Sequence, residues 1–185
     1  MAQTEERPID SVALQQLLDE RAIRRVILTY PRGMDRADAE VVSSIYFEDA
    51  LDFHGSRAGL GVDYANHIVE NMHRGGRFFT MHFMGDTFFE WDGAGEVAHT
   101  ETYVRASHTL EQDGEQILEL FFGRYLDRFE RRNGEWRIAR RVTIRDYMCN
   151  TPVTPMMPER PFQGRRDLED PSYQHLRMEI LDFNG

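Results

Sequence analysis

The sequence predicts an α+β domain in which a curved antiparallel sheet wraps around three N-terminal helices, followed by an extended C-terminal arm. In three segments before residue 76 of this 185-residue chain the residues favour helices, and from residue 78 the apolar residues recur at a period of two. Three turn signals divide the later part into strands, namely Asp92-Gly93, Asp113-Gly114 and Asn133-Gly134. Helices that precede a meander of long strands are typical of this fold class.

The first predicted helix covers residues 11–30. Asp10 or Ser11 can cap its start, and Pro31 together with Gly33 predicts that it ends or kinks near Tyr30. One face of this helix is apolar over its length: Leu14, Leu17, Leu18, Ile23, Val26, Ile27 and Tyr30. This spacing is typical of an amphipathic helix.

Two shorter helices complete the helical layer. A corner of the chain leads into a second helix over 39–47, with Asp38 as the expected N-cap. After an extended piece with turns at 49–61, a third helix opens at Asp63 and stops at Gly75-Gly76.

Four long strands are predicted, at roughly 78–91, 96–110, 115–130 and 135–147. In the first strand one face is almost entirely apolar and the other, mixed face carries His82; in the last strand Arg141 lies on the mixed face. Two arrangements remain open. Either the mixed face lines a pocket and a homo-oligomer contact covers the apolar face, or the apolar face packs on the helices and leaves His82 and Arg141 in solvent.

The chain is predicted to form one domain at 11–149, preceded by a flexible segment at 1–10 and followed by an arm at 150–185 that can pack on a neighbouring subunit. No apolar run spans a bilayer and the first ten residues lack a signal peptide, so a cytoplasmic location without a membrane partner is expected. The net charge is -10, and no predicted helix collects arginines on one face, so we expect no nucleic-acid partner.

Lysine is absent, because all 22 basic residues are arginine. This excludes Schiff-base catalysis, covalently attached pyridoxal phosphate and the phosphate clamp of P-loop proteins. The single cysteine, Cys149, excludes a disulfide framework within the chain. His99 and Glu101 share a strand face, but His108 lies on the opposite face and no carboxylate cluster supports a metal site. We therefore predict neither a metal nor a cofactor.

Several motifs, taken in order, resemble the SnoaL-like family of the nuclear transport factor 2-like superfamily over residues 10–148. They are Leu17-Leu18-Asp19-x-x-Ala22-Ile23-x-x-Val26, Tyr30, Met34-Asp35-Arg36-Ala37-Asp38, residues 47–50, His82-x-x-Gly85, Gly123-Arg124-Tyr125-Leu126-Asp127 and Gly134-x-Trp136-Arg137-Ile138-Ala139-x-Arg141. The resemblance implies a cone-shaped fold with a deep apolar pocket between sheet and helices. It also implies a homo-oligomer, either a trimer or a dimer.

The resemblance further implies a catalytic dyad. Cofactor-free dehydratases, dehydrohalogenases and bile-acid dehydratases of this superfamily use an Asp at the end of the first helix and a His on the first long strand, and Asp35 and His82 fall at those positions. Tyr30 resembles a tyrosine of the bile-acid dehydratases, and Arg141 matches an arginine of the dehydrohalogenases. Pro31 departs from the unbroken helix that is usual in the family.

These residue types suit acid/base chemistry. A carboxylate beside the imidazole of His82 fixes its tautomer and stabilises the imidazolium, while Arg141 can stabilise an enolate or phenolate. Tyr30 or Tyr103 can protonate a departing oxygen. Each residue also has a structural interpretation: Asp35 suits a turn, Tyr30 a core aromatic and Tyr103 a cross-strand aromatic pair. The candidate walls of the substrate pocket are Phe53, His54, Phe78, Phe79, Phe121 and Tyr125.

The predicted activity is that of a cofactor-free lyase that removes water or formaldehyde from a hydroxylated aromatic, diaryl, steroid or terpenoid compound. Formaldehyde loss is included because the family contains a bacterial diarylpropane deformylase. Two alternatives remain: an isomerase or polyketide cyclase that uses the same dyad, and a non-catalytic subunit or binding domain like the β subunit of ring-hydroxylating dioxygenases. A structure that separates Asp35 from His82 would contradict the enzyme hypotheses.

Overall fold

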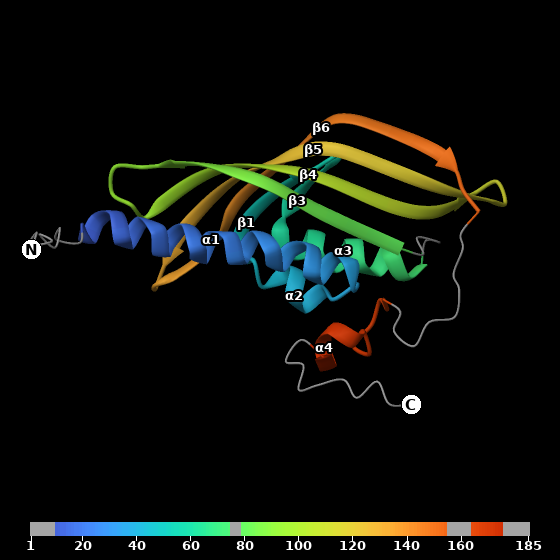
Figure 1. The fold of residues 1–185 in the computed structure, drawn as a ribbon, viewed down its shortest axis with the longest axis horizontal. Coiled ribbons are helices and arrows are strands. Elements are labelled where there is room, and N and C mark those ends of the chain that lie inside the picture. Colours follow the sequence, from blue (N-terminus) through green and yellow to red (C-terminus); the bar gives the residue numbers. More distant parts are fainter. Residues whose placement is uncertain (1–9, 75–78, 155–163, 176–185) are drawn as a thin grey trace, which may run out of the picture.

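The computed structural model describes residues 10–74, 79–154 and 164–175, and it has the predicted α+β architecture (Figure 1). The helices are α1 (Ser11–Asp35), α2 (Ala39–Ser43), α3 (Gly61–Arg74) and α4 (Pro171–His175). The strands are β1 (Tyr46–His54), β2 (Arg57–Leu60), β3 (Phe79–Trp91), β4 (Val97–Gln112), β5 (Glu115–Arg132) and β6 (Glu135–Pro152). No helix in these described ranges is long and apolar enough to cross a membrane.

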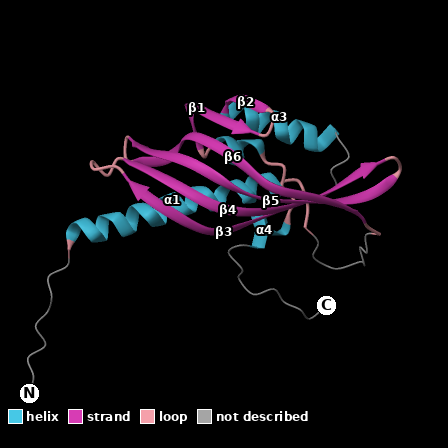
Figure 2. Ribbon diagram, turned by 90° about the horizontal axis from the view of Figure 1, so that it is seen from above, coloured by secondary structure: helices cyan, strands magenta, loops and turns pink. Residues whose placement is uncertain are grey.

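One curved sheet, in the order β2-β1-β6-β5-β4-β3, arches over the three N-terminal helices. Strands β3 to β6 form the predicted antiparallel meander, and the tight turns at Asp113-Gly114 and Asn133-Gly134 have the positive φ angles that such hairpins require. Helix α2 ends at Ser43 and not at Phe47 as predicted, because β1 begins at Tyr46; the rest of β1 was predicted only as an extended piece, and the strand pairs in parallel with β6. Figure 2 shows α1 beneath the β3 and β4 side of the sheet and α3 beside β1 and β2.

Helix α1 was predicted to end or kink near Tyr30, but it continues through Pro31 to Asp35. Proline lacks the N–H group that would bond to the fourth carbonyl before it, but tertiary contacts hold the last turn in place. A Cβ added at Gly33 would lie 2.7 Å from the Val42 side chain, so α1 and α2 are in very close contact there. Asp38 caps α2 as predicted, since its carboxylate accepts a hydrogen bond from the Val41 amide.

A bulge in β3 changes which side chains face the helices. Gly85 and Asp86 together lie opposite Tyr103, because the pairing shifts between Met84 and Thr87. The mixed face that carries His82 is the inner face before the bulge, so the arrangement with His82 in solvent is wrong. After the bulge the alternation reverses, and the aromatic side chains of the second half pack on the core: Phe89 and Trp91.

A second bulge, at Ala139 of β6, has the same effect. The pairing of Phe129 with Ile138 is followed by that of Arg128 with Arg140, which leaves Ala139 as the extra residue. Ile138 and Arg141 are therefore both buried on the inner face. The prediction of strictly alternating faces was wrong for β3 and β6 because a bulge shifts every following side chain by one position.

The core lies between the helices and the concave face of the sheet, and it includes Ile23, Ile27, Tyr30, Val42, Tyr125, Phe129 and Ile138. The convex face remains open to solvent in the single chain and carries exposed apolar side chains: Met81, Phe83, Phe88, Tyr103 and Tyr147. We refer to these five residues as the convex apolar patch.

The C-terminal arm differs from its prediction at its start, because β6 extends to Pro152. Further along, α4 lies against the corner between α1 and α2 of the same chain (Figure 1). Arg36 donates to Asp170 and Ser172, and the Tyr173 hydroxyl donates to Asp38 at 2.6 Å. The described ranges leave out residues 1–9, 155–163 and 176–185. Most of the predicted flexible N-terminus, residues 1–10, is therefore outside them.

Candidate active site

The carboxylate of Asp35 and the imidazole of His82 are in direct contact. Asp35 Oδ1 lies 2.8 Å from His82 Nδ1, and Asp35 Oδ2 accepts a hydrogen bond of 3.1 Å from the backbone N–H of His82. Thr80, two residues earlier on β3, donates to Asp35 Oδ1 at 3.2 Å. The last turn of α1 and the first half of β3 therefore hold the carboxylate at three points.

This contact determines which ring nitrogen of His82 is available for chemistry. A carboxylate at Nδ1 favours the tautomer with the proton on Nδ1, which leaves Nε2 as a proton acceptor. The His82 side chain is only 4% exposed, while that of Asp35 is 21% exposed. The ring of Tyr30 lies edge-on to His82 with centroids 5.6 Å apart, so the imidazole is enclosed on that side as well.

His82 lines a cavity of about 320 Å³ between the sheet and α3. One part of its wall is apolar and comes from α1, α3, β5 and β6: Met34, Ile68, Met72, Phe121 and Met148. The polar groups of the wall are His54, Arg57, Tyr64, His108, Glu119, Thr143 and Arg145. A pocket of this size, whose wall combines apolar side chains with several polar groups, suits a small organic ligand.

A second histidine–carboxylate pair, His108 and Glu119, lines the same cavity. His108 Nδ1 lies 3.0 Å from Glu119 Oε1, and the His108 ring is 5.6 Å from the ring of His82. The prediction from the sequence considered His108 only as a candidate metal ligand. Counting outward from the Asp113-Gly114 turn would have paired His108 with Glu119, since the two are opposite each other in the hairpin.

Tyr30 is fully buried and does not line the cavity itself. Its hydroxyl lies 3.4 Å from that of Tyr64, which belongs to α3 and lines the cavity. Burial raises the pKa of both hydroxyls well above the ordinary value of 10.0, so each stays protonated at neutral pH. Tyr64 was not among the predicted site residues, and its place beside His54 depends on how α3 packs against β1.

Arg141 lies beneath the cavity and does not line it. It donates two hydrogen bonds of 2.7 Å to Asp127, and both side chains are 0% exposed. Its guanidinium also packs over the rings of Tyr30 and Tyr125, 4.6 Å and 4.3 Å from their centroids. Burial raises the pKa of Asp127, and the charge of Arg141 opposes that rise. The predicted contact of Arg141 with an enolate would require the guanidinium to reach the cavity, whose lining does not include it.

Of the predicted pocket walls, the structure places His54, Phe121 and Tyr125 at the cavity. The prediction needs correction for the walls Phe53 and Phe79 and for the predicted proton donor Tyr103, because all three lie outside the cavity. Phe53 packs under Arg140 on the other side of β1, and Phe79 is 41% exposed. Tyr103 is 59% exposed because its neighbours on β4 alternate inward, which directs its own side chain to the convex face. Phe78 lies outside the described residues.

The described part of the chain brings no three His, Cys, Asp or Glu side chains together in a way that could hold a metal ion. Glu101, one member of the pair considered for a metal, instead accepts a hydrogen bond of 2.7 Å from Arg124.

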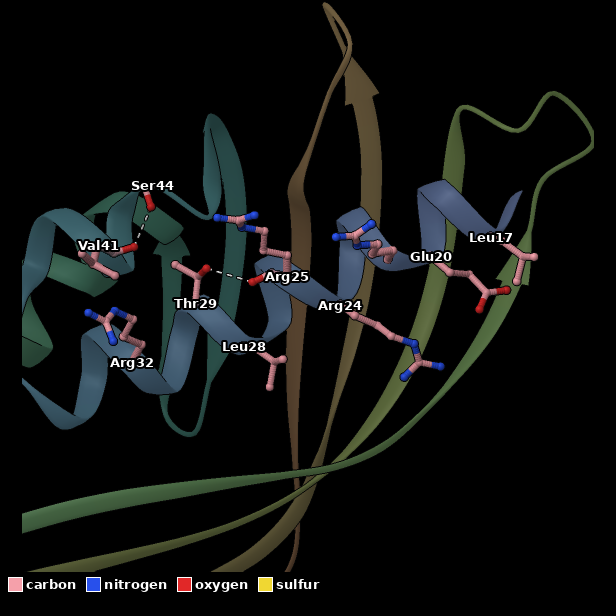
Figure 3. A pocket seen from close by; sticks show the side chains of 10 residues that line it. Leu17, Glu20, Arg24, Arg25, Leu28, Thr29, Arg32, Val41 and Ser44 are labelled. Atoms are coloured by element: carbon pink, nitrogen blue, oxygen red, sulfur yellow. Dashed lines mark hydrogen bonds between the residues drawn. The ribbon is translucent and has the colours of Figure 1, made fainter. Parts of the chain in front are cut away.

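A larger hollow, of about 850 Å³, lies on the outside of α1 and is open to solvent (Figure 3). Arginines and exposed leucines of α1 border it, together with Val41 of α2 and Ser44, which caps the end of α2: Arg21, Arg24, Arg25, Arg32, Leu17, Leu28, Val41 and Ser44. It contains neither member of the Asp35–His82 pair. The smaller cavity is therefore the candidate active site.

Comparison with known proteins supports the fold. The profile of the SnoaL-like domain matches residues 15–142. A search of the curated proteins found no match to this sequence.

Solved structures with the same fold include three from Novosphingobium. A putative scytalone dehydratase from Novosphingobium aromaticivorans is 19% identical, with a TM-score of 0.64 over 75% of this chain and 91% of its own. A hexachlorocyclohexane dehydrochlorinase from Novosphingobium barchaimii is 21% identical, with a TM-score of 0.67 over 80% and 99%. The β subunit of a putative aromatic-ring-hydroxylating dioxygenase from Novosphingobium aromaticivorans is 19% identical, with a TM-score of 0.57 over 71% and 91%.

At identities this low, the structural matches establish the shared fold alone. The profile match is more specific, because it covers well over half of the chain and includes the end of α1, β3 and most of the cavity wall. The protein belongs to the SnoaL-like family.

Proposed function

We propose that the protein is a cofactor-independent lyase that removes water or formaldehyde from a hydroxylated aromatic or related apolar compound, with His82 and Asp35 as its acid/base pair. The observation that carries this proposal is the 2.8 Å contact between Asp35 and an imidazole that lines a cavity between the sheet and α3. A carboxylate–imidazole pair beside a ligand-sized space is the arrangement expected of a general base.

In a dehydration, Nε2 of His82 takes a proton from carbon, and the electron pair of that C–H bond forms a C=C bond as the neighbouring C–O bond breaks. Asp35 stabilises the resulting imidazolium. The departing hydroxide takes a proton from a second acid in the cavity wall and leaves as water. His108, held by Glu119, and the hydroxyl of Tyr64 are the two candidates for that acid.

Loss of formaldehyde uses the same base on a different proton. His82 takes the hydroxyl proton of a CH2OH group, the C–C bond breaks, and formaldehyde leaves while the electron pair stays on the carbon framework. An aromatic ring conjugated with that carbon spreads the charge, and the imidazolium or His108 returns a proton. Two acid/base pairs facing one cavity support either sequence of proton transfers.

An isomerase is the second candidate, because the 5.6 Å separation of the two imidazole rings would allow one to remove a proton and the other to return it at a different carbon. The solved structures of similar fold include a putative dehydratase and a dehydrochlorinase, which favours elimination. The dioxygenase β subunit shows that the same fold also serves as a subunit of a larger enzyme.

We also propose that the protein is a homo-oligomer in which a second copy covers the convex apolar patch. Several large apolar side chains exposed on one sheet face are typical of an interaction surface. A trimer and a dimer would both cover it.

Mass spectrometry of products tests the proposed activity. The protein is incubated with a panel of hydroxylated diaryl, aromatic, steroid and terpenoid compounds, alongside the variants His82→Ala, Asp35→Asn and His108→Gln. His99→Gln is the matched control, since His99 lies on β4 and does not line the cavity. Loss of 18 or 30 mass units that disappears in His82→Ala and persists in His99→Gln would support the lyase; these masses are those of water and formaldehyde. An unchanged mass with a new retention time would support the isomerase, and binding without conversion would support a subunit or binding role.

A further inference from the structure

Two arginines lie at the open end of the active-site cavity. Arg57 begins β2, and Arg145 belongs to β6; both line the cavity and both are exposed to solvent. Arg145 lies beside the turn that leads to Arg57, since a Cβ added at Gly55 of that turn would be 3.7 Å from Arg145 Nη2. The parallel pairing of β1 with β6 brings these distant positions together.

These two guanidinium groups differ from most other arginines of the sheet. Arg124, Arg131 and Arg141 each form an ion pair with a carboxylate. Within the residues that the structure describes, neither Arg57 nor Arg145 forms an ion pair with a carboxylate. Arg57 donates instead to His67 Nε2, which is uncharged when it accepts that bond.

The charge of the cavity is therefore unbalanced at this end. Its only lining carboxylate among the described residues is Glu119, which is held by His108. A chain with a formal net charge of -10 thus presents two positive groups at the entrance of its cavity. Guanidinium groups bind carboxylates through paired hydrogen bonds, and partial enclosure strengthens such contacts compared with bulk water.

We propose that the substrate is an aromatic compound with an anionic group, a carboxylate, which binds to Arg145 and Arg57 while its reacting end lies next to His82. This inference rests on the proposed lyase function and specifies its substrate class. The apolar part of the ligand would lie against the methionine and phenylalanine side chains between the two ends: Met34, Met72, Phe121 and Met148. The two arginines are binding residues in this account and take no part in proton transfer.

Calorimetric titration separates binding from turnover. The His82→Ala protein is titrated with 4-hydroxycinnamate and with its neutral amide, which has nearly the same shape. The same pair is titrated into proteins that also carry Arg145→Gln, Arg57→Gln or Arg105→Gln. Arg105 is the control, because it lies on β4 over the Phe83 ring and outside the cavity. Asp35→Asn replaces His82→Ala as the background if the latter does not fold.

We expect the acid to bind roughly tenfold or more tightly than the amide, as one charge-assisted hydrogen bond contributes about this factor. Arg145→Gln should remove most of that preference, Arg57→Gln part of it, and Arg105→Gln none. Equal binding of acid and amide, no binding of either, or an equal effect of Arg105→Gln would overturn the inference. If the protein binds the acid more tightly than the amide but converts no compound, the lyase proposal alone is contradicted. If it converts neutral compounds and binds acid and amide equally, the proposal of an anionic substrate alone is contradicted.

Discussion

Removing one partner of the buried ion pair between Arg141 and Asp127 should strongly destabilise the protein, and Arg141→Met tests this. Methionine keeps much of the apolar volume and cannot donate a hydrogen bond. The replacement leaves the Asp127 carboxylate buried, 0% exposed, without the two hydrogen bonds of 2.7 Å that it accepts in the native protein. Leaving one partner of such a pair uncompensated costs about 3–5 kcal/mol.

That cost is large relative to the whole protein. A domain of this kind is typically stable by about 5–15 kcal/mol, and for a chain of this length each kcal/mol lowers the Tm by roughly 2–4 °C. We therefore expect the Tm of Arg141→Met to fall by roughly 6–20 °C. Urea unfolding followed by tryptophan fluorescence gives the free energy directly, because Trp136 and Trp91 lie in or against the core.

The loss should depend on pH with a definite sign. Burial already raises the pKa of Asp127, and removal of Arg141 takes away the charge that opposes the rise. An acid with a raised pKa in the folded state binds more protons there than in the unfolded chain, so stability falls as pH rises above about 4. Arg141→Met should thus become less stable from pH 4 to pH 7, and Arg141→Met with Asp127→Leu should not.

The double variant also separates a structural role from a catalytic one. Replacing both partners by apolar residues of similar size is often nearly neutral for stability, so the double variant should regain most of the loss and keep its turnover. A cost below about 1 kcal/mol for Arg141→Met would refute the reasoning. A stable double variant without turnover would show that Arg141 contacts the substrate after all.

Three other substitutions test separate parts of the structure. Gly33→Ala places a Cβ 2.7 Å from the Val42 side chain, and overpacking of this kind should cost about 1–3 kcal/mol in urea unfolding; an unchanged protein would mean that the α1–α2 contact is loose. Thr80→Val removes the hydrogen bond to Asp35 and should lower kcat by roughly tenfold with Tm nearly constant, while an equal loss in KM and Tm would point to misfolding. Phe83→Glu adds a charge to the convex apolar patch and should reduce the subunit number in light scattering; an unchanged mass would place the interface elsewhere.

The sequence predicted the helical layer and the meander because their signals are local. Turn residues with positive φ, at Asp113-Gly114 and Asn133-Gly134, define the hairpins, and the capping residues Asp10 and Asp38 define helix starts. Helix α1 passed through Pro31 because tertiary contacts of its last turn outweighed the local signal. The bulges were not predicted, since one extra residue in a strand has no strong signature in a single sequence.

The sequence could predict those site residues whose position depends only on a helix end, a strand or a hairpin. The end of α1 and the middle of the first half of β3 place Asp35 and His82, and the family resemblance pointed to both. His108–Glu119 could have been found from the hairpin register. Arg145 could not, because its place at the cavity depends on the parallel pairing of β1 with β6, a contact between segments almost ninety residues apart.

The central claim is that Asp35 and His82 act as one unit in proton transfer, and a double-mutant cycle in kcat tests it most directly. With a compound that the native protein converts, kcat is measured for the native protein, His82→Ala, Asp35→Asn and the double variant. Each single variant should lose roughly 10²–10⁴-fold, and Asp35→Asn should cost nothing further once His82 is gone, because the carboxylate works only through the imidazole. Losses that multiply in the double variant, or turnover that survives in His82→Ala, would contradict the dyad.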